Sequence, residues 1–340
     1  MRGLFLIGIG ALAASSAASS TLIGIAQQGV GQTPSPLPLT QTIRERGTSV
    51  TPAFEGWFYG RDGSLNLLVG YFNRNTKQEF DIPVGPNNRV EPGGPDVGQP
   101  THFASGRQWG VFSIKVPKDF GTKKLTWTIV ANGFTNAITL HTQADYVVEP
   151  YEDAANKNTP PKLRFTENGP IFTGAPTALA EKYAATVGVP LTLTVWATDE
   201  GPKINVPENT GRGRGRGRGA GRGADAGGGA DAAGPGAPGR GAAGGAGAPP
   251  EFAFTPPPPL ALTWTMFRGP APVKFENAKP KIDAAKNGEA TTTAMFSAPG
   301  DYILRVQGND STGEGGGGFQ CCWTNAHVAV TVKPAATGGQ

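Results

Sequence analysis

The sequence predicts an all-β protein with two immunoglobulin-like β-sandwich domains. Short segments rich in Trp, Thr, Val and Leu alternate apolar with polar residues, which is the period of a half-buried strand. The chain has 51 glycines and 31 prolines among 340 residues, about twice the average share, so frequent turns are expected. Charged residues make up only 16%, which argues against a coiled coil or a helical bundle.

An export signal is predicted over residues 1–26. A single arginine precedes the apolar run Leu4–Ala14, and small residues follow at Ser15–Ser20, which is the three-part pattern of a secretory signal. Cleavage after Ala18 or Ala26 would place the protein in the periplasm or outside the cell, without a transmembrane span. The alternative is an uncleaved anchor, because residues 4–26 carry no charge and are long enough to span a bilayer.

A Pro-rich segment, residues 27–48, is expected to form an extended linker. The first sandwich follows over residues 49–149. Asp62-Gly63 lies between two apolar runs, which indicates a tight hairpin, and Asn132-Gly133 indicates another. The expected strands are Phe54–Tyr59, Leu65–Phe72, Phe80–Ile82, Trp109–Val116, Leu125–Val130 and Phe134–His141. In Trp109–Val116 only the second half alternates.

Residues 150–175 are expected to be a linker, and residues 176–334 the second sandwich, followed by a short tail over 335–340. The expected strands are Leu191–Trp196, Leu262–Phe267, Thr291–Phe296, Tyr302–Val306 and Val328–Val332. The second sandwich is interrupted by an insertion at 211–250, which holds 17 Gly, 11 Ala, 6 Arg, 4 Pro and 2 Asp. Because the insertion has no aromatic or branched apolar residue, we expect it to be a disordered loop.

The segment Phe296–Val306 has the pattern F-x-x-P-G-x-Y-x-L-x-V and is followed by Asn309-Asp310. It resembles the penultimate strands of PKD-like and related immunoglobulin-like modules of secreted bacterial proteins. The resemblance implies that Pro299-Gly300 makes a turn and that Tyr302 anchors the corner of the sandwich. It is close over about 45 residues, and such modules are mostly spacers and binding domains. The chain as a whole resembles uncharacterised exported proteins.

The net charge of +4 lies entirely in the insertion, so the rest of the chain is neutral. An Arg-Gly run can bind nucleic acid, but such segments usually interleave aromatic residues for stacking, and Gly211–Gly219 has none. We therefore expect no nucleic-acid partner. A solvated loop is the simpler interpretation, and contact with anionic envelope polymers is the alternative.

The two cysteines, Cys321 and Cys322, are adjacent. Neighbouring Cα atoms lie about 3.8 Å apart in a trans chain, which is below the usual disulfide window. Three states remain open: two small apolar side chains, a vicinal disulfide, or an intermolecular bridge or metal site with His327. The metal site has the weakest support, because the spacing is not that of a zinc motif.

Acidic residues end two expected strands of the second sandwich, and strand ends of this kind meet at one pole of such a fold. Calcium prefers carboxylate and carbonyl oxygens, so a calcium site is one hypothesis, and solvated turns are the other. No other cofactor is expected. The hypothetical ligands are Asp199, Glu200, Asp310 and Glu314, near Asn309.

The long segment Pro83–Gln108 is rich in Gly and Pro and carries Arg89, His102 and Arg107. Long ordered loops are often functional, so these three residues are a hypothetical contact for an anionic or carbohydrate ligand. An irregular cover over a sheet is the alternative. His102 has no identifiable nucleophile or orienting carboxylate nearby in the sequence, so it is a poor candidate for a general base.

No nucleophile-elbow, zinc-protease, Walker or dinucleotide motif occurs in the sequence. We therefore expect a non-enzymatic, exported binding or scaffolding protein of the cell envelope, with a protein or polysaccharide as partner. An accessory domain of an envelope enzyme complex is the first alternative. A carboxylate-based glycan hydrolase is the second, because paired carboxylates leave no local signature. The sequence leaves the oligomeric state open.

Overall fold

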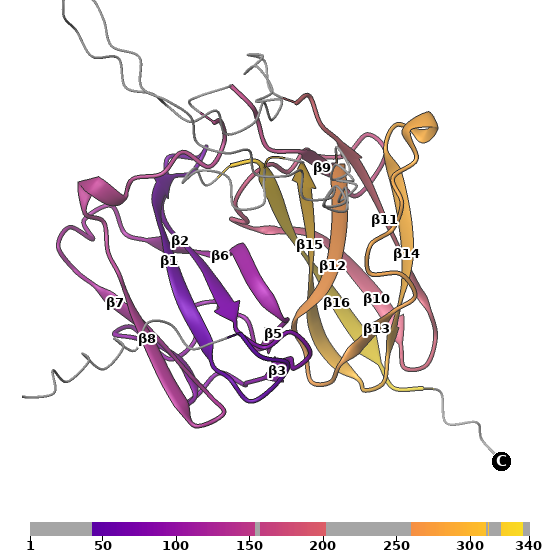
Figure 1. The fold of residues 1–340 in the computed structure, drawn as a ribbon. Coiled ribbons are helices and arrows are strands. Elements are labelled where there is room, and N and C mark those ends of the chain that lie inside the picture. Colours follow the sequence, from indigo (N-terminus) through magenta and orange to yellow (C-terminus); the bar gives the residue numbers. More distant parts are fainter. Residues whose placement is uncertain (1–42, 154–156, 202–259, 311, 313–320, 336–340) are drawn as a thin grey trace, which may run out of the picture. The chain divides into compact units, whose positions relative to one another are not determined.

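The computed structural model describes residues 43–153, 157–201, 260–310, 312 and 321–335 (Figure 1). These residues form strands and two short 3-10 helices, which confirms the all-β prediction. The predicted signal segment, most of the linker that follows it, the 211–250 insertion and the end of the tail lie outside the described residues. Within the described part of the chain, no helix is long and apolar enough to cross a membrane.

The first sandwich has two three-stranded antiparallel sheets and a small strand pair. One sheet has the order β1 (Val50–Tyr59), β2 (Leu65–Asn73), β6 (Gly106–Val116). The other has the order β4 (Asn88–Glu91), β7 (Leu125–Ala131), β8 (Phe134–Leu140). Strands β3 (Phe80–Asp81) and β5 (His102–Phe103) pair separately, and the 3-10 helix η1 (Ala144–Tyr146) follows β8.

Both predicted hairpins are present in the first sandwich. Gly60 donates its N–H to the Ser64 carbonyl over 2.7 Å, and Gly63 has a φ of 72°, which a residue without a Cβ adopts readily. Between β7 and β8, both Asn132 (φ 50°) and Gly133 (φ 79°) have positive φ. Positive φ at both central residues matches the right-handed twist of the two strands, which is why Asn-Gly is favoured there.

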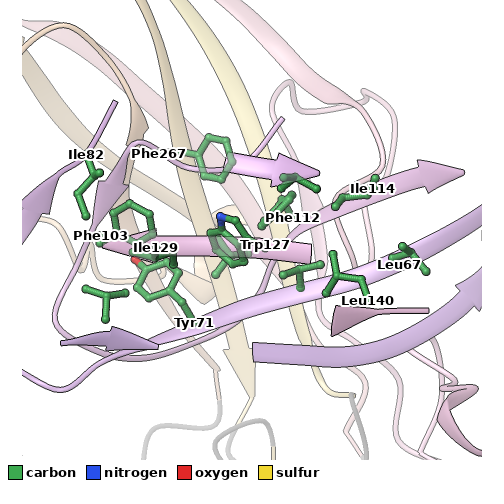
Figure 2. Packing of buried hydrophobic residues seen from close by; sticks show 14 of the residues in the cluster. Leu67, Tyr71, Ile82, Phe103, Phe112, Ile114, Trp127, Ile129, Leu140 and Phe267 are labelled. Atoms are coloured by element: carbon green, nitrogen blue, oxygen red, sulfur yellow. The ribbon is translucent and has the colours of Figure 1, made fainter. Parts of the chain in front are cut away.

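The first core is built around Trp127 of β7, which is fully buried (Figure 2). Its ring lies 5.2 Å from that of Phe112 and 6.3 Å from that of Phe103, and its Nε1–H donates to Asn88 Oδ1 over 3.0 Å. The indole is therefore packed and hydrogen-bonded at once, as a buried Trp requires. One member of this core, Phe267, comes from the second sandwich.

The second sandwich has two four-stranded sheets. One has the order β9 (Lys162–Arg164), β11 (Leu191–Thr198), β14 (Glu289–Phe296), β13 (Val273–Phe275). The other has the order β10 (Leu179–Thr186), β16 (Trp323–Lys333), β15 (Gly300–Asp310), β12 (Leu260–Arg268). The 3-10 helix η2 (Ala284–Lys286) precedes β14. This is the A-B-E-D and C-F-G order of immunoglobulin-like sandwiches, with β10 added in parallel to β16.

The core of the second sandwich shows the predicted alternation clearly in β11. Leu193, Val195 and Ala197 are buried, while Thr194 and Trp196 between them are only partly buried. Tyr302 of β15 is 1% exposed, and its hydroxyl donates to the Ala298 carbonyl over 2.9 Å. That hydrogen bond, four residues back along the chain, is the one expected of a tyrosine at the corner of such a sandwich.

Two segments are more structured than the sequence indicated. The predicted linker 150–175 contains β9, which pairs with β11, so the second sandwich begins before residue 176. The segment 83–108, predicted as a loop, contains β4 and β5. β4 has only one buried apolar residue, Val90, so its four residues are too few to show a period.

Candidate ligand-binding cleft

The two sandwiches meet at a junction formed largely by bulged residues. The register of β1 shifts around Glu55, that of β6 shifts in the stretch 109–111, and that of β12 shifts around Phe267. A bulge re-aims a side chain that would otherwise face the wrong side of its sheet. Phe267 thereby reaches the core of the first sandwich, and its carbonyl accepts from the Thr101 N–H over 3.0 Å.

The junction contains a buried ion pair within the first sandwich. Arg107 Nη2 lies 2.7 Å from Glu55 Oε1, and the other carboxylate oxygen accepts from the Gly110 N–H over 2.8 Å. The Glu55 side chain is 1% exposed. Burial raises the pKa of Glu55 above its usual value, although Arg107 and the Gly110 N–H favour its charged form. A Cβ on Gly70 would lie 2.1 Å from Glu55 Oε1, so glycine leaves room for the carboxylate.

The second sandwich contributes polar side chains to the same junction. Arg305 of β15 donates to Gln108 Oε1 and is 2% exposed. Burial lowers the pKa of Arg305, while Tyr71 and Glu55 act in the opposite direction. The Nε and Nη1 atoms of Arg305 have no hydrogen-bond partner among the described residues.

Two side chains of β16 bind the bulged stretch of β6 directly. Asn325 donates from Nδ2 to the carbonyls of Trp109 and Gly110, over 2.9 and 3.0 Å. His327 Nε2 lies 3.0 Å from the Val111 carbonyl, and burial lowers the pKa of His327 to about 3, so it donates as a neutral imidazole. These bonds join the backbone of one sandwich to side chains of the other.

Packing between Gly110 and Trp323 completes the junction. Gly110 has a φ of 51°, and a Cβ there would lie 1.8 Å from the Trp323 ring. Trp323 is 1% exposed and belongs to a third apolar cluster with Phe58, Leu68 and Ala175. Since this cluster draws on both sandwiches, the two are held by apolar as well as polar contacts, and both belong to one compact unit.

A cleft of about 310 Å³ opens beside this junction. Its walls come from the β1–β2 hairpin and Lys115 of β6 on one side, and from Tyr151, the segment 171–178 and Asn325 of β16 on the other. The polar lining residues are Arg61, Asp62, Ser64, Asn66, Lys115, Tyr151, Thr173, Thr177 and Asn325. The cleft therefore depends on the relative position of the two sandwiches, which the junction fixes.

The charged groups of the cleft are already positioned by neighbours. The Arg61 guanidinium lies 4.7 Å from the centre of the Tyr151 ring, and its Nη2 donates to Thr173 Oγ1 over 3.1 Å. Lys115 Nζ lies 3.2 Å from Asp62 Oδ2. Hydrogen bonds from Ser64, together with Lys115, hold the pKa of Asp62 well below its usual range. Donors and an anionic acceptor thus face the same opening, beside an apolar wall at Ile171, which is 57% exposed.

The residues predicted as a ligand contact lie on three different sheets. Arg89 of β4 pairs with Glu91 at 2.8 Å, and Arg107 belongs to the buried ion pair described above. His102 Nδ1 lies 2.8 Å from Asp81 Oδ1, and its Nε2 lies 3.3 Å from Glu79 Oε2. Burial alone would lower the pKa of His102, but hydrogen bonds to Asp81 and Glu79 outweigh it and raise the pKa to about 9. Each of the three residues thus has its own carboxylate partner.

The acidic residues proposed as calcium ligands are partly gathered at one pole. Burial, and then the nearby Asp310, raise the pKa of Asp199 to about 6. Asp310 accepts from Asn158 Nδ2 over 2.5 Å, and Glu200 pairs with Lys162. Glu314 lies outside the described residues. Among the described residues, no group of three or more His, Cys, Asp or Glu side chains is arranged to hold a metal ion, so a calcium site remains a prediction.

Cys321 and Cys322 are joined to each other in a disulfide, which is one of the three states that the sequence left open. The two residues are 6% and 1% exposed, and Cys321 Sγ lies 3.7 Å from the Asn158 carbonyl. The disulfide directly precedes Trp323 in the sequence, and Trp323 is one of the junction residues.

The sequence pattern does not identify the cleft residues as a site. It indicates only a hairpin turn at Asp62, and it places Tyr151 and Thr173 in the predicted linker. Their common position arises from the bulges and the junction, which leave no local pattern. Comparison with protein-family models finds no match to this chain, and comparison with curated proteins finds no significantly similar sequence.

Proposed function

We propose that the protein is a non-enzymatic, exported binding protein of the cell envelope, which holds a segment of a polysaccharide or protein in the cleft between its two sandwiches. One observation carries this proposal: the cleft lies between the two sandwiches and gathers donors, an acceptor and an apolar wall at one opening. Ligand sites occur preferentially at such domain interfaces and combine an apolar lining with a few fixed polar groups.

Pre-positioning of the polar groups supports binding. Arg61 is held against Tyr151 and Thr173, so little side-chain freedom remains to be lost when a ligand arrives. The cleft volume of about 310 Å³ is at the lower end of the range for ligand pockets, roughly 300–1,000 Å³. That size favours a short segment of a polymer over a whole folded partner. The predicted export signal supports the envelope as the place of action.

Binding can be measured by isothermal titration of the purified protein with soluble fragments of envelope polysaccharides and with peptides from envelope proteins. The proposal expects saturable binding to at least one of these ligands. Arg61→Ala is expected to weaken it roughly tenfold or more, because a hydrogen bond from a charged group typically contributes about 1.5–3 kcal/mol.

Lys123→Ala serves as the matched control, because Lys123 is an exposed cation of the first sandwich outside the cleft. Unchanged affinity in Arg61→Ala would show that the ligand binds elsewhere. Absence of binding to every ligand of the panel, or retention of the protein inside the cell, would contradict the proposed function.

A further inference from the structure

A second surface of the first sandwich carries a row of aromatic residues. Phe54, Trp57 and Tyr59 lie on β1, and His141 and Tyr146 lie on the chain that follows β8; these five residues are called the aromatic surface below. Phe54 and Trp57 both pack against the edge of the first core. Tyr59 is 62% exposed and Tyr146 is 47% exposed.

The rings of the aromatic surface hold one another in place. Phe54 lies 4.8 Å from His141 and 5.8 Å from Tyr146, and His141 lies 4.6 Å from Tyr146. Trp57 meets Tyr59 edge to face at 5.6 Å. The Nε1–H of Trp57 donates to the Gln143 carbonyl over 2.7 Å, so the indole is fixed as well. Such contacts are typical of stable aromatic pairs.

The backbone brings these residues to one side of the sheet. The register shift between Phe54 and Gly56 leaves Phe54 and Trp57 on the same face of β1, although they are three residues apart. The chain after η1 then runs parallel to β1, where Val147 forms a bridge with Trp57. Gly56 permits this approach, since a Cβ there would lie 2.5 Å from the Val148 side chain.

The exposed rings are spaced along β1. Tyr146 precedes Val147, which is level with Trp57, so Tyr146 lies near the level of Gly56, three residues before Tyr59. Three residues of a strand span roughly 10 Å. This is about the length of a disaccharide unit in an extended polysaccharide of β-linked pyranoses. Two exposed tyrosines whose backbone positions have that spacing can each offer a ring to the apolar C–H face of one sugar.

We propose that the aromatic surface binds an extended polysaccharide of β-linked pyranoses, with sugar rings stacked on Tyr59 and Tyr146. The negative face of an aromatic ring attracts the weakly positive C–H groups of a pyranose, while the tyrosine hydroxyls can hydrogen-bond to sugar hydroxyls. This inference rests on the proposed function and narrows it, because it chooses polysaccharide over protein, but it uses residues that are not part of the cleft.

The contacts of β1 favour this occupant over an added peptide strand. A peptide that extends a sheet needs free backbone groups at the edge of that sheet. Here the Trp57 carbonyl already accepts from the Val148 N–H over 2.9 Å, so that stretch of β1 is paired.

The test is a binding assay of the purified protein on insoluble β-1,4-linked polymers, namely cellulose and chitin, with soluble cello- and chito-oligosaccharides as competitors. We expect binding to at least one polymer. Tyr59→Ala and Tyr146→Ala should each weaken it roughly three- to tenfold, because a ring contact is a moderate contribution. Tyr59→Phe should retain most of the affinity, since the ring is kept.

Phe134→Ala is the matched control, because Phe134 is a 41% exposed aromatic residue at the other end of β8. Thermal unfolding of each variant verifies that it is folded. Binding to neither polymer, or equal losses in Phe134→Ala and Tyr59→Ala, would overturn the inference. So would a change of oligomeric state in Tyr59→Ala, measured by sedimentation, with polymer binding unchanged. Measuring Arg61→Ala and Tyr59→Ala in both the titration and the polymer assay separates the two proposals, because a loss in only one assay assigns the ligand of that assay to the surface that carries the substituted residue.

Discussion

Strands of the two cores and strands at the junction differ in the regularity of their pairing. β11 and β14 pair without any register shift, and so do β7 and β8, whereas β1, β6 and β12 each contain a shift at the junction. Phe267, at the shift in β12, packs in the core of the first sandwich, and the bulged stretch of β6 accepts hydrogen bonds from Asn325 and His327 of β16. Regular alternation of buried and exposed side chains therefore forms each core. The register shifts, which interrupt this alternation, position the residues of the junction and of the cleft beside it.

Substitutions inside the two cores are expected to show the largest effects on stability. Trp127 and Trp264 are 0% and 1% exposed, one in each core. Trp127→Ala or Trp264→Ala should lower the free energy of unfolding by about 3–5 kcal/mol, because each leaves a large cavity. Urea denaturation followed by circular dichroism measures this. If the junction couples the sandwiches, either substitution shifts a single unfolding transition of the whole protein. Two separate unfolding transitions would show that the sandwiches unfold independently.

The buried ion pair is the next most sensitive feature. Arg107→Met leaves the Glu55 carboxylate buried without its main partner, which should cost about 3 kcal/mol of unfolding free energy. The double variant Glu55→Gln, Arg107→Met should recover part of this loss, because no unpaired charge remains. Urea midpoints of the two single variants and the double variant give the coupling. Strictly additive losses would show that the two side chains do not interact.

Gly110 and Gly63 provide a sharper test of the junction, because both have positive φ but only Gly110 faces a neighbour. Gly63→Ala should cost about 1 kcal/mol for its backbone conformation. Gly110→Ala should cost about 1–3 kcal/mol more, because its Cβ would overlap the Trp323 ring. Thermal unfolding compares the two variants. Equal losses would show that the contact with Trp323 is looser than described.

Changes of pH should affect stability less than the substitutions above, and their effect should differ between the two sandwiches. The pKa of His102, in the first, is raised to about 9, so its contribution is complete below about pH 6.5 and is lost as the pH rises to about 9. Glu79 and Asp81 are more than half exposed, so the expected loss is only about 1–2 kcal/mol. His102→Gln should abolish this slope in urea denaturation across the range.

Asp199, in the second sandwich, acts at lower pH. Its pKa is raised to about 6, so the folded state binds its proton more tightly than the unfolded state, and stability falls as the pH rises from about 4 to about 6. Since the side chain is only partly buried, the loss should stay below about 1 kcal/mol. Asp199→Asn should be slightly more stable than the native chain at pH 7. A less stable variant would contradict the repulsion by Asp310.

The same contrast explains how much the sequence could predict. Leu191–Trp196 and Leu125–Val130 alternate cleanly, and both are strands at nearly those bounds. The motif Phe296–Val306 correctly placed Tyr302 at a corner. Trp109–Val116 alternates only in its second half, because Trp109, Gly110 and Val111 form the bulge. Binding partners of Arg61 and Arg107 lie far away in the chain, so neither the cleft nor the ion pair leaves a local pattern.

Hydrogen exchange measured by mass spectrometry tests most directly whether the junction makes one rigid body of the two sandwiches, on which the cleft depends. Peptides covering β7 of the first sandwich and β15 of the second should exchange through the same global opening, with free energies within about 1 kcal/mol of each other. Arg107→Met should lower the opening free energies of β7 and β15 by the same amount. Opening of one sandwich at a clearly lower free energy, with the other unaffected, would contradict the account.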